Sequence, residues 1–262
     1  MEGFVMEYET LLVDLKDRVA IVRMNREESM NALEYQLCVD LVNCFKALSK
    51  YDEAKVVILT GRGKAFSAGG DLRELKKRMK VSEAKNYVLH VSKIIPVIKN
   101  LEKPVIAAVN GAAIGAGFSI AMACDLVVAS EKAIFSQAFV QVGLVPDLGG
   151  TYFTPRLVGL NMAKELAFMG KILSAHELAK LRMINYVVPP EELETKAFHL
   201  ACQIAESPSL AIGLTKKLLN QSLNSNFEEM LELEAQYQAA CMQSEDFMEC
   251  IKAFFEKRKK PI

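Results

Sequence analysis

Short runs of apolar, β-branched residues alternate with longer segments of helical spacing in the first part of the chain. The runs Thr10–Val13, Val19–Met24 and Val56–Thr60 predict β-strands. Between the last two runs, apolar residues recur every three or four positions through Ala32–Ser49, which predicts a helix. The order strand, helix, strand indicates a βαβ unit with a parallel strand pair, and therefore an α/β fold.

The pattern changes in the second half of the chain, where helical spacing dominates. Strands are still predicted at Val105–Val109, Leu126–Ala129 and Ala133–Ser136, with a short helix at Phe118–Cys124. The helices predicted after Asn161 are Ala163–Met169, Ser174–Leu181, Pro190–Glu206, Ser209–Ser222 and Phe227–Arg258. The apolar face of the last helix is broader than one short neighbour would cover. Core packing could use part of this face, and we interpret the rest as an oligomer interface.

Composition narrows the class of protein. The 262 residues contain 32 Lys and Arg against 32 Asp and Glu, so no global field attracts nucleic acid or an anionic membrane. The six cysteines form no Cys-x-x-Cys pair and indicate core residues in a reducing compartment. The N-terminus lacks the pattern of a secretory signal, and no apolar run reaches the length of a membrane helix. We therefore expect a soluble, cytoplasmic protein.

Two glycine-rich loops are the strongest chemical signal. Lys64–Asp71 follows the strand Val56–Thr60, and Asn110–Ser119 follows the strand Val105–Val109. Ligands of α/β folds bind at such strand ends, and glycine lets the backbone approach a ligand closely. The second loop lacks the spacing of a dinucleotide-binding fingerprint, and either loop alone is also consistent with a tight turn. Two loops that donate N–H groups to one oxygen would instead form an oxyanion hole.

Five motifs, in their order and spacing, resemble the enoyl-CoA hydratase/isomerase, or crotonase, family from about Tyr8 to the C-terminus. They are NREESMNAL at 25–33, KAFSAGGD at 64–71, PVIAAVNGAAIGAGFSIAMACD at 104–125, FSQAFVQVGLVPDLGGT at 135–151 and FFEKRKK at 254–260. The resemblance implies a spiral core of ββα units over residues 1–200 and a C-terminal helical trimerisation region over 201–262. It further implies a homotrimer or homohexamer.

The resemblance also implies a substrate site. The oxyanion donors would be the backbone N–H groups of Gly70 and Ala116, both directed at one thioester oxygen. The acyl-CoA thioester would be the substrate, and neither a separate cofactor nor a metal is expected. The residues expected to contact this substrate are Ser29, Met30, Ala32, Leu33, Ala68, Asp71, Leu72, Ser119 and Phe139. Asp71 is interpreted as an acceptor that organises its loop.

Three positions depart from the hydratases of the family. Ser119 and Phe139 stand where hydratases carry two glutamates, and neither side chain can serve as a carboxylate base. Asp147 stands where a subgroup of enoyl-CoA isomerases has its catalytic aspartate. A shift of the double bond from 3-enoyl to 2-enoyl needs one proton carrier, so this reaction is favoured, within fatty acid or aromatic acid metabolism. From the residues alone, Asp147 could also be a turn or helix-capping aspartate before two glycines.

Other functions remain open from the sequence. One is hydration of an enoyl-CoA or a cyclic dienoyl-CoA with help from Asp147. Another is a non-catalytic member that binds a CoA thioester or RNA, although the two loops and Asp147 would then have no use. A dehalogenase is disfavoured because the chain has no tryptophan. We interpret His90 as a helix-face residue, and the run Lys257–Lys260 either as a solvated charge cluster or as a contact to the CoA of a neighbouring subunit.

Overall fold

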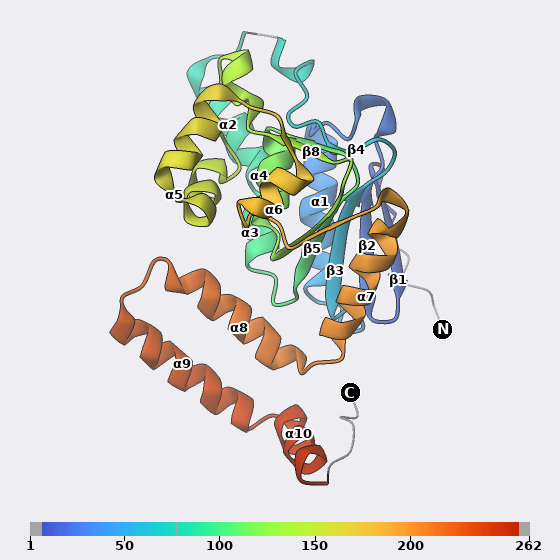
Figure 1. The fold of residues 1–262 in the computed structure, drawn as a ribbon, viewed down its shortest axis with the longest axis vertical. Helices are drawn as coiled ribbons and strands as arrows, with labels where there is room; N and C mark the ends of the chain where they lie inside the picture. Colours follow the sequence, from blue (N-terminus) through green and yellow to red (C-terminus); the bar gives the residue numbers. More distant parts are fainter. Residues whose placement is uncertain (1–6, 77, 257–262) are drawn as a thin grey trace.

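A mostly parallel sheet forms the centre of the fold in the computed structural model, which describes residues 7–76 and 78–256 (Figure 1). Its strands lie in the order β1-β2-β3-β5-β7-β10, and only the β1–β2 pair is antiparallel. Their bounds are Leu11–Lys16, Val19–Met24, Val56–Gly61, Val105–Val109, Leu126–Ser130 and Tyr186–Val188. The predicted parallel pair therefore exists, because β2 and β3 run side by side with α1 (Tyr35–Leu48) between them in sequence.

A second, smaller sheet explains the spiral. Strands β3, β5 and β7 of the main sheet are each followed by a short strand, β4 (Ala65–Ser67), β6 (Ala112–Ile114) and β8 (Ile134–Ser136). These short strands lie in the order β4-β6-β8-β9, with β9 at Leu173–Ser174. Each repeat thus places one long strand in the main sheet and one short strand in the second sheet. The prediction of a repeated ββα core in an α/β fold is confirmed.

Helices cover both faces of the main sheet, which is why its central strands are buried along their whole length. Val57 and Leu59 of β3 face the larger core, to which α1 and α4 (Ala116–Ala123) contribute. Val56 and Ile58 face the opposite way and pack with α7 (Leu193–Ala205). The remaining helices before residue 193 are α2, α3 and α6 at Val81–Val91, Ile94–Lys99 and Ala175–Lys180, and the short 3-10 helices at Glu27–Ser29, Glu74–Lys76, Ala138–Val142 and Pro190–Glu192.

Helix α5 (Gly150–Met169) is longer than predicted. The sequence indicated a helix only from Ala163, because Pro155 and Gly159 interrupt the apolar spacing. Gly159 has a non-helical φ of 77°, so α5 is two helical segments joined at a kink. In the described part of the chain, no helix is both long enough and apolar enough to cross a membrane.

The C-terminal helices extend away from the core (Figure 1). They are α8 (Ser209–Ser222), α9 (Phe227–Met242) and α10 (Glu245–Phe255). The single helix predicted for Phe227–Arg258 is wrong, since Ser244 caps α10 by accepting a hydrogen bond from the N–H of Phe247 and so breaks the run in two. The predicted boundary between the core and the C-terminal region, at residue 200, falls inside α7. This helix packs against the main sheet along its whole length, as far as Ala205. Lys257–Lys260 lie outside the described residues.

A buried lysine attaches α8 to the core. The side chain of Lys216 is 7% exposed and its Nζ lies 2.6 Å from a carboxylate oxygen of Asp125. The same ammonium donates hydrogen bonds to the backbone oxygens of Ile98 and Lys103, each at 3.0 Å. Burial lowers the pKa of Lys216, and the nearby Asp125 carboxylate raises it. The ion pair therefore offsets part of the free energy lost when the ammonium is removed from water.

Removing this ammonium should destabilise the protein. Lys216→Met leaves Asp125 without its partner, and we expect the free energy of unfolding to fall by about 3 kcal/mol. Lys217→Met is the matched control, since Lys217 pairs with Glu102 at the surface and should cost less than about 1 kcal/mol. Urea unfolding of both variants measures the difference, and equal losses would contradict the anchoring role of Lys216.

Candidate active site

The two glycine loops pack backbone against backbone. A Cβ atom on Gly69 would lie 2.6 Å from the backbone oxygen of Ile114, and one on Gly117 would lie 2.4 Å from that of Ser67. Gly69 also has a φ of 91°, which a side chain would strain. The loops can approach this closely only because these positions lack side chains. The ends of β4 and β6 therefore meet at one place.

The backbone around Gly70 leaves its N–H group free. The N–H of Leu33 donates to the oxygen of Gly69 at 2.7 Å, and the N–H of Asp71 donates to the oxygen of Leu33 at 3.0 Å. These two bonds flank Gly70 and fix the loop on both sides of it. Within the described residues, the Gly70 N–H donates no hydrogen bond.

Ala116 begins α4, so its N–H is one of the first helical N–H groups, which have no partner inside the helix. The preceding residue, Gly115, has a φ of 54° and donates its own N–H to Ser136 at 2.8 Å. In the described part of the chain the Ala116 N–H donates no hydrogen bond either. The positive end of the helix dipole adds to its attraction for a negative oxygen.

Gly70 and Ala116 line the same cavity, which has a volume of about 330 Å³. Its wall is mostly apolar. Among the described residues that line it, the polar side chains are Asp147 and Tyr87, and the Tyr87 hydroxyl donates to Glu74 at 2.9 Å. Burial raises the pKa of Tyr87 and keeps its hydroxyl protonated. An apolar chamber with two N–H groups and one carboxyl is suited to proton transfer next to a polarised carbonyl.

Asp147 lines this cavity from the loop before α5. Its Oδ1 atom is buried and accepts no hydrogen bond from the described residues. Burial raises the pKa of the carboxyl from 3.8 to about 6, although a hydrogen bond from its own backbone opposes the rise. Most carboxylates in folded proteins avoid such a position, since a buried charge without partners is costly. The alternative of a turn or capping aspartate holds in part: no side-chain cap bond occurs at the start of α5, but the backbone oxygen of Asp147 accepts the N–H of Gly150 at 2.8 Å, so Asp147 begins a turn.

The expected substrate contacts divide into two groups. Leu33, Ala68, Leu72 and Phe139 line the cavity together with the two donors and Asp147. The others do not line it, and they are Ser29, Met30, Ala32, Asp71 and Ser119. Asp71 accepts hydrogen bonds from the backbone and the guanidinium of Arg73, which lower the pKa of its carboxyl. This contact agrees with its interpretation as a loop-organising acceptor.

Ser119 lies behind the cavity wall. The side chain is fully buried, and its hydroxyl donates to the backbone oxygen of Asp147 at 2.9 Å. Its expected place on the substrate surface is therefore corrected. The residue sits in a fully buried helix, and its Oγ is turned toward the neighbouring loop.

Sequence reasoning missed several wall residues. Tyr87 and its neighbours on α2 form one side. The residues after β8 form another side. The missed wall residues are Met79, Ala84, Tyr87, Val88, Val91, Ile114, Ala138, Val142, Leu144 and Val145. Met79 and the residues of α2 lie outside the five motifs, and the others lie within two motifs at positions to which no role was assigned, so only the fold brings them together. His90 stacks on Tyr35 with ring centroids 4.2 Å apart, in agreement with its interpretation as a helix-face residue.

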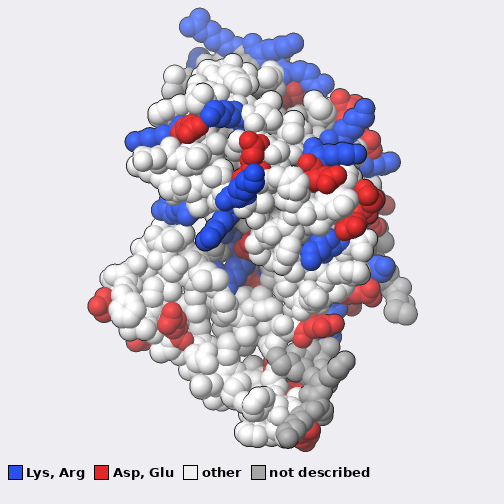
Figure 2. Space-filling view, viewed as in Figure 1, with Lys and Arg blue, Asp and Glu red and all other residues white. Residues whose placement is uncertain are grey.

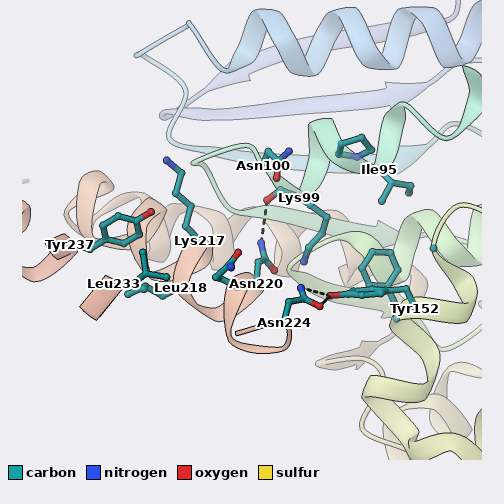
Figure 3. Close-up of a pocket in the computed structure, with 14 residues that line it drawn as sticks. Ile95, Lys99, Asn100, Tyr152, Lys217, Leu218, Asn220, Asn224, Leu233 and Tyr237 are labelled. Atoms are coloured by element: carbon teal, nitrogen blue, oxygen red, sulfur yellow. Dashed lines mark hydrogen bonds between the residues drawn. The ribbon is translucent and has the colours of Figure 1, made fainter. Parts of the chain in front are cut away.

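A larger hollow of about 760 Å³ lies between α3, α5, α8 and α9 (Figure 3). The hydrogen bonds made by its lining residues connect neighbouring segments of the fold. The amide of Asn220 donates to the backbone oxygen of Lys99 at 3.1 Å, and Asn224 and Tyr152 bond to each other. The described residues that line it include neither a carboxylate nor a histidine, the groups that most often exchange a proton near neutral pH.

Comparison with known proteins assigns the family. The family of enoyl-CoA hydratase/isomerase matches residues 14–261. A short-chain-enoyl-CoA hydratase from Clostridium acetobutylicum is 36% identical over 255 residues, which are 97% of this chain and 97% of that protein. A 1,2-epoxyphenylacetyl-CoA isomerase from Escherichia coli is 35% identical and covers 95% of this chain and 97% of its own.

Solved structures agree with this assignment. The crystal structure of an enoyl-CoA hydratase from Bacillus anthracis has a TM-score of 0.93 at 33% identity and covers 97% of this chain and 98% of its own. The chain belongs to the enoyl-CoA hydratase/isomerase family, as the motifs predicted, and is an enzyme of that family. Its similar relatives include both hydratases and an isomerase.

Burial of the Asp147 carboxylate predicts a measurable cost in stability. The folded protein holds this proton up to about pH 6, whereas an unfolded aspartate loses it near 3.8. Folding stability therefore falls as pH rises through that window, and the full cost is present at pH 7. Because the side chain is only partly buried, we estimate the cost at roughly 1–3 kcal/mol.

Asp147→Asn should remove this cost. At pH 7 we expect the variant to be more stable than the wild type by roughly 1–3 kcal/mol, and at pH 3.5 the two should be nearly equal. Urea unfolding at both pH values, at one protein concentration, measures this. Asp52→Asn, at an exposed position, should change stability little at either pH. A destabilised Asp147→Asn at neutral pH would contradict the description of this carboxyl as a charge whose burial is not compensated.

Proposed function

We propose that the protein shifts the double bond of an enoyl-CoA thioester from the 3,4 to the 2,3 position, with Asp147 as the proton carrier. The observation that carries this proposal is the carboxyl of Asp147, which shares one apolar cavity with the N–H groups of Gly70 and Ala116. The carboxyl has no competing partner on Oδ1 among the described residues. The CoA thioester is the substrate, and the reaction uses neither a further cofactor nor a metal.

The chemistry requires one base and one oxyanion site. The Asp147 carboxylate takes a proton from C2, and the electrons move onto the thioester oxygen to give a dienolate. Hydrogen bonds from Gly70 and Ala116 stabilise that oxygen, each by roughly 3 kcal/mol in comparable sites. The same carboxyl then returns the proton to C4 and leaves the double bond conjugated with the thioester. No atom is gained or lost, so a single group suffices.

The acidity of Asp147 suits this task. A carboxyl with a pKa of about 6 is ionised at neutral pH, yet it is a stronger base than an ordinary aspartate. The expected positions of the two hydratase glutamates hold Ser119 and Phe139. Ser119 is buried away from the cavity, and Phe139 adds only an aromatic wall. A water molecule would therefore lack the two carboxylates that activate it and protonate C2.

Hydration is the second candidate, since the names of two similar relatives are those of hydratases acting on short-chain-enoyl-CoA and on crotonyl-CoA. In that case Asp147 would activate water for addition to an enoyl-CoA or a cyclic dienoyl-CoA. A protein that only binds a CoA thioester or RNA remains the third candidate. A panel of 2-enoyl, 3-enoyl and cyclic dienoyl thioesters distinguishes all three.

Replacing Asp147 tests the proposal. Asp147→Asn keeps the size of the side chain but cannot accept a proton at neutral pH. We expect isomerisation of 3-enoyl-CoA to fall by a factor of about 10⁴ or more, while thioester affinity stays within about threefold of the wild type. The appearance of the conjugated thioester gives the rate, and calorimetric titration gives the affinity.

The outcomes separate the candidates. Full isomerase activity in Asp147→Asn would rule out the proposed mechanism. Strong hydration by the wild type, lost in the variant, would support the hydratase. Binding without turnover of any thioester by the wild type would support the non-catalytic candidate.

We also propose that the protein is a homotrimer or a dimer of trimers in the cytoplasm. Figure 2 shows a largely uncharged surface over the C-terminal helices. Phe227 is 72% exposed, and Phe254 and Phe255 are more than three-quarters exposed, which an isolated chain in water would avoid. A closed ring of copies would bury these side chains.

Light scattering at micromolar concentration tests this assembly. We expect three or six copies in the wild type and dissociation in the Phe227→Lys/Phe254→Lys variant, because each new ammonium would enter an apolar interface. Val81→Lys, at an exposed position on α2, should leave the assembly intact. A wild-type monomer would exclude the proposal.

A further inference from the structure

We propose that Ser119 is a positioning residue for Asp147, whose hydroxyl fixes the loop of the proton carrier relative to the oxyanion site. This inference rests on the proposed function, because it concerns how the carboxyl of Asp147 is held for proton transfer. Ser119 takes no part in the chemistry itself, since its side chain does not line the cavity.

Among the described residues, others bond to the backbone of Asp147, whereas its carboxyl accepts a hydrogen bond from its own backbone. The backbone oxygen of Asp147 accepts the Ser119 hydroxyl at 2.9 Å and the N–H of Gly150 at 2.8 Å. In contrast, Oδ1 of the same residue accepts no bond from the described residues. Fixing a base through its own side chain would compete with proton transfer. Fixing it through its backbone oxygen avoids that competition.

Ser119 lies on α4, the same helix that carries one of the two oxyanion donors. Ala116 is the first residue of α4, and Ser119 follows one helical turn later. One rigid, fully buried helix therefore carries an oxyanion donor at its start and the hydroxyl that holds the base. The distance between the thioester oxygen and the carboxyl is thus set by a single element.

The loop itself needs this support. Leu148 and Gly149, which follow the base directly, both have left-handed backbone angles, with φ of 48° and 80°. Such a conformation costs a non-glycine residue about 1 kcal/mol or more and persists only where the surroundings impose it. A second buried contact, in which the amide of Gln137 donates to the hydroxyl of Thr154 at 2.6 Å, joins the residue before the 3-10 helix at Ala138–Val142 to α5.

Gly150 offers an independent way to disturb Ser119. A Cβ atom there would lie 2.9 Å from the Ser119 Oγ, and its next contact, with Pro146, would be at 3.3 Å. Gly150 does not have a positive φ, so alanine can adopt its backbone conformation. The first atom that Gly150→Ala displaces is therefore the hydroxyl of Ser119.

The first experiment removes the hydroxyl. Ser119→Ala should lower kcat for 3-enoyl-CoA isomerisation by about ten- to a hundredfold through misplacement of the base, with KM within about threefold. The acid limb of the pH–kcat profile should move to lower pH, because a loosened carboxylate reaches water. Ser136→Ala is the matched control. Its buried hydroxyl likewise donates to a backbone oxygen at 2.9 Å, but that oxygen belongs to Gly170.

The second experiment is a double-mutant cycle. If Gly150→Ala acts through Ser119, it should lower kcat about tenfold or more in the wild type and much less in the Ser119→Ala background. Circular dichroism and light scattering on each variant exclude a loss of fold or assembly. Additive losses in kcat would contradict the coupling.

The failures of the two proposals are distinguishable. If the wild type does not isomerise 3-enoyl-CoA, or Asp147→Asn retains activity, the proposed function fails. If Asp147→Asn is inactive while Ser119→Ala matches Ser136→Ala in kcat and in pH profile, only the positioning role of Ser119 fails.

Discussion

Direct contact between two backbone loops is the constraint on which the site depends. The loop after β4 and the loop after β6 approach so closely that a side chain on Gly69 or Gly117 would collide with backbone oxygens. This contact brings the free N–H groups of Gly70 and Ala116 to one cavity. It also sets where α4 begins, and α4 in turn holds the loop of Asp147 through Ser119. The spiral of paired strands provides the ends at which the loops meet.

The same site carries a cost that the rest of the fold must offset. Asp147 is placed where burial raises its pKa to about 6, and Leu148 beside it has a left-handed backbone. Both features lower stability, and the first gives the carboxyl the basicity that the proposed reaction needs. The large apolar cores on either side of the main sheet supply the compensating stability. In the proposed mechanism, stability and activity are thus opposed at one residue.

Much of the fold could be predicted from the sequence, for a physical reason. Strands β2 and β5 have the predicted bounds because buried, β-branched runs in a parallel sheet differ sharply from their flanks. The start of α5 was missed because Pro155 and Gly159 disturb the apolar spacing, although the chain remains helical on both sides of a kink. The break between α9 and α10 was missed because a single serine cap, Ser244, ends a run whose apolar spacing continues.

For the site, the sequence could predict the residues whose roles follow from the motifs. It could not predict the residues that only packing brings to the cavity. Gly70, Ala116 and Asp147 belong to motifs, and they line one cavity. Met79 and Tyr87 belong to no motif and join the wall only through the fold. The orientation of Ser119 depends on a rotamer and on the path of a loop distant in sequence. Its contact with Asp147 could not be foreseen.

The most direct test of the central claim follows the oxygen of water during turnover. With 3-enoyl-CoA in heavy-oxygen water, mass spectrometry of the first product should give a 2-enoyl thioester that contains no oxygen from the solvent, because one carboxyl only moves a proton within the substrate. A 3-hydroxyacyl thioester carrying heavy oxygen as the first product, at a rate equal to substrate loss, would contradict the assignment of Asp147 as the proton carrier of an isomerase.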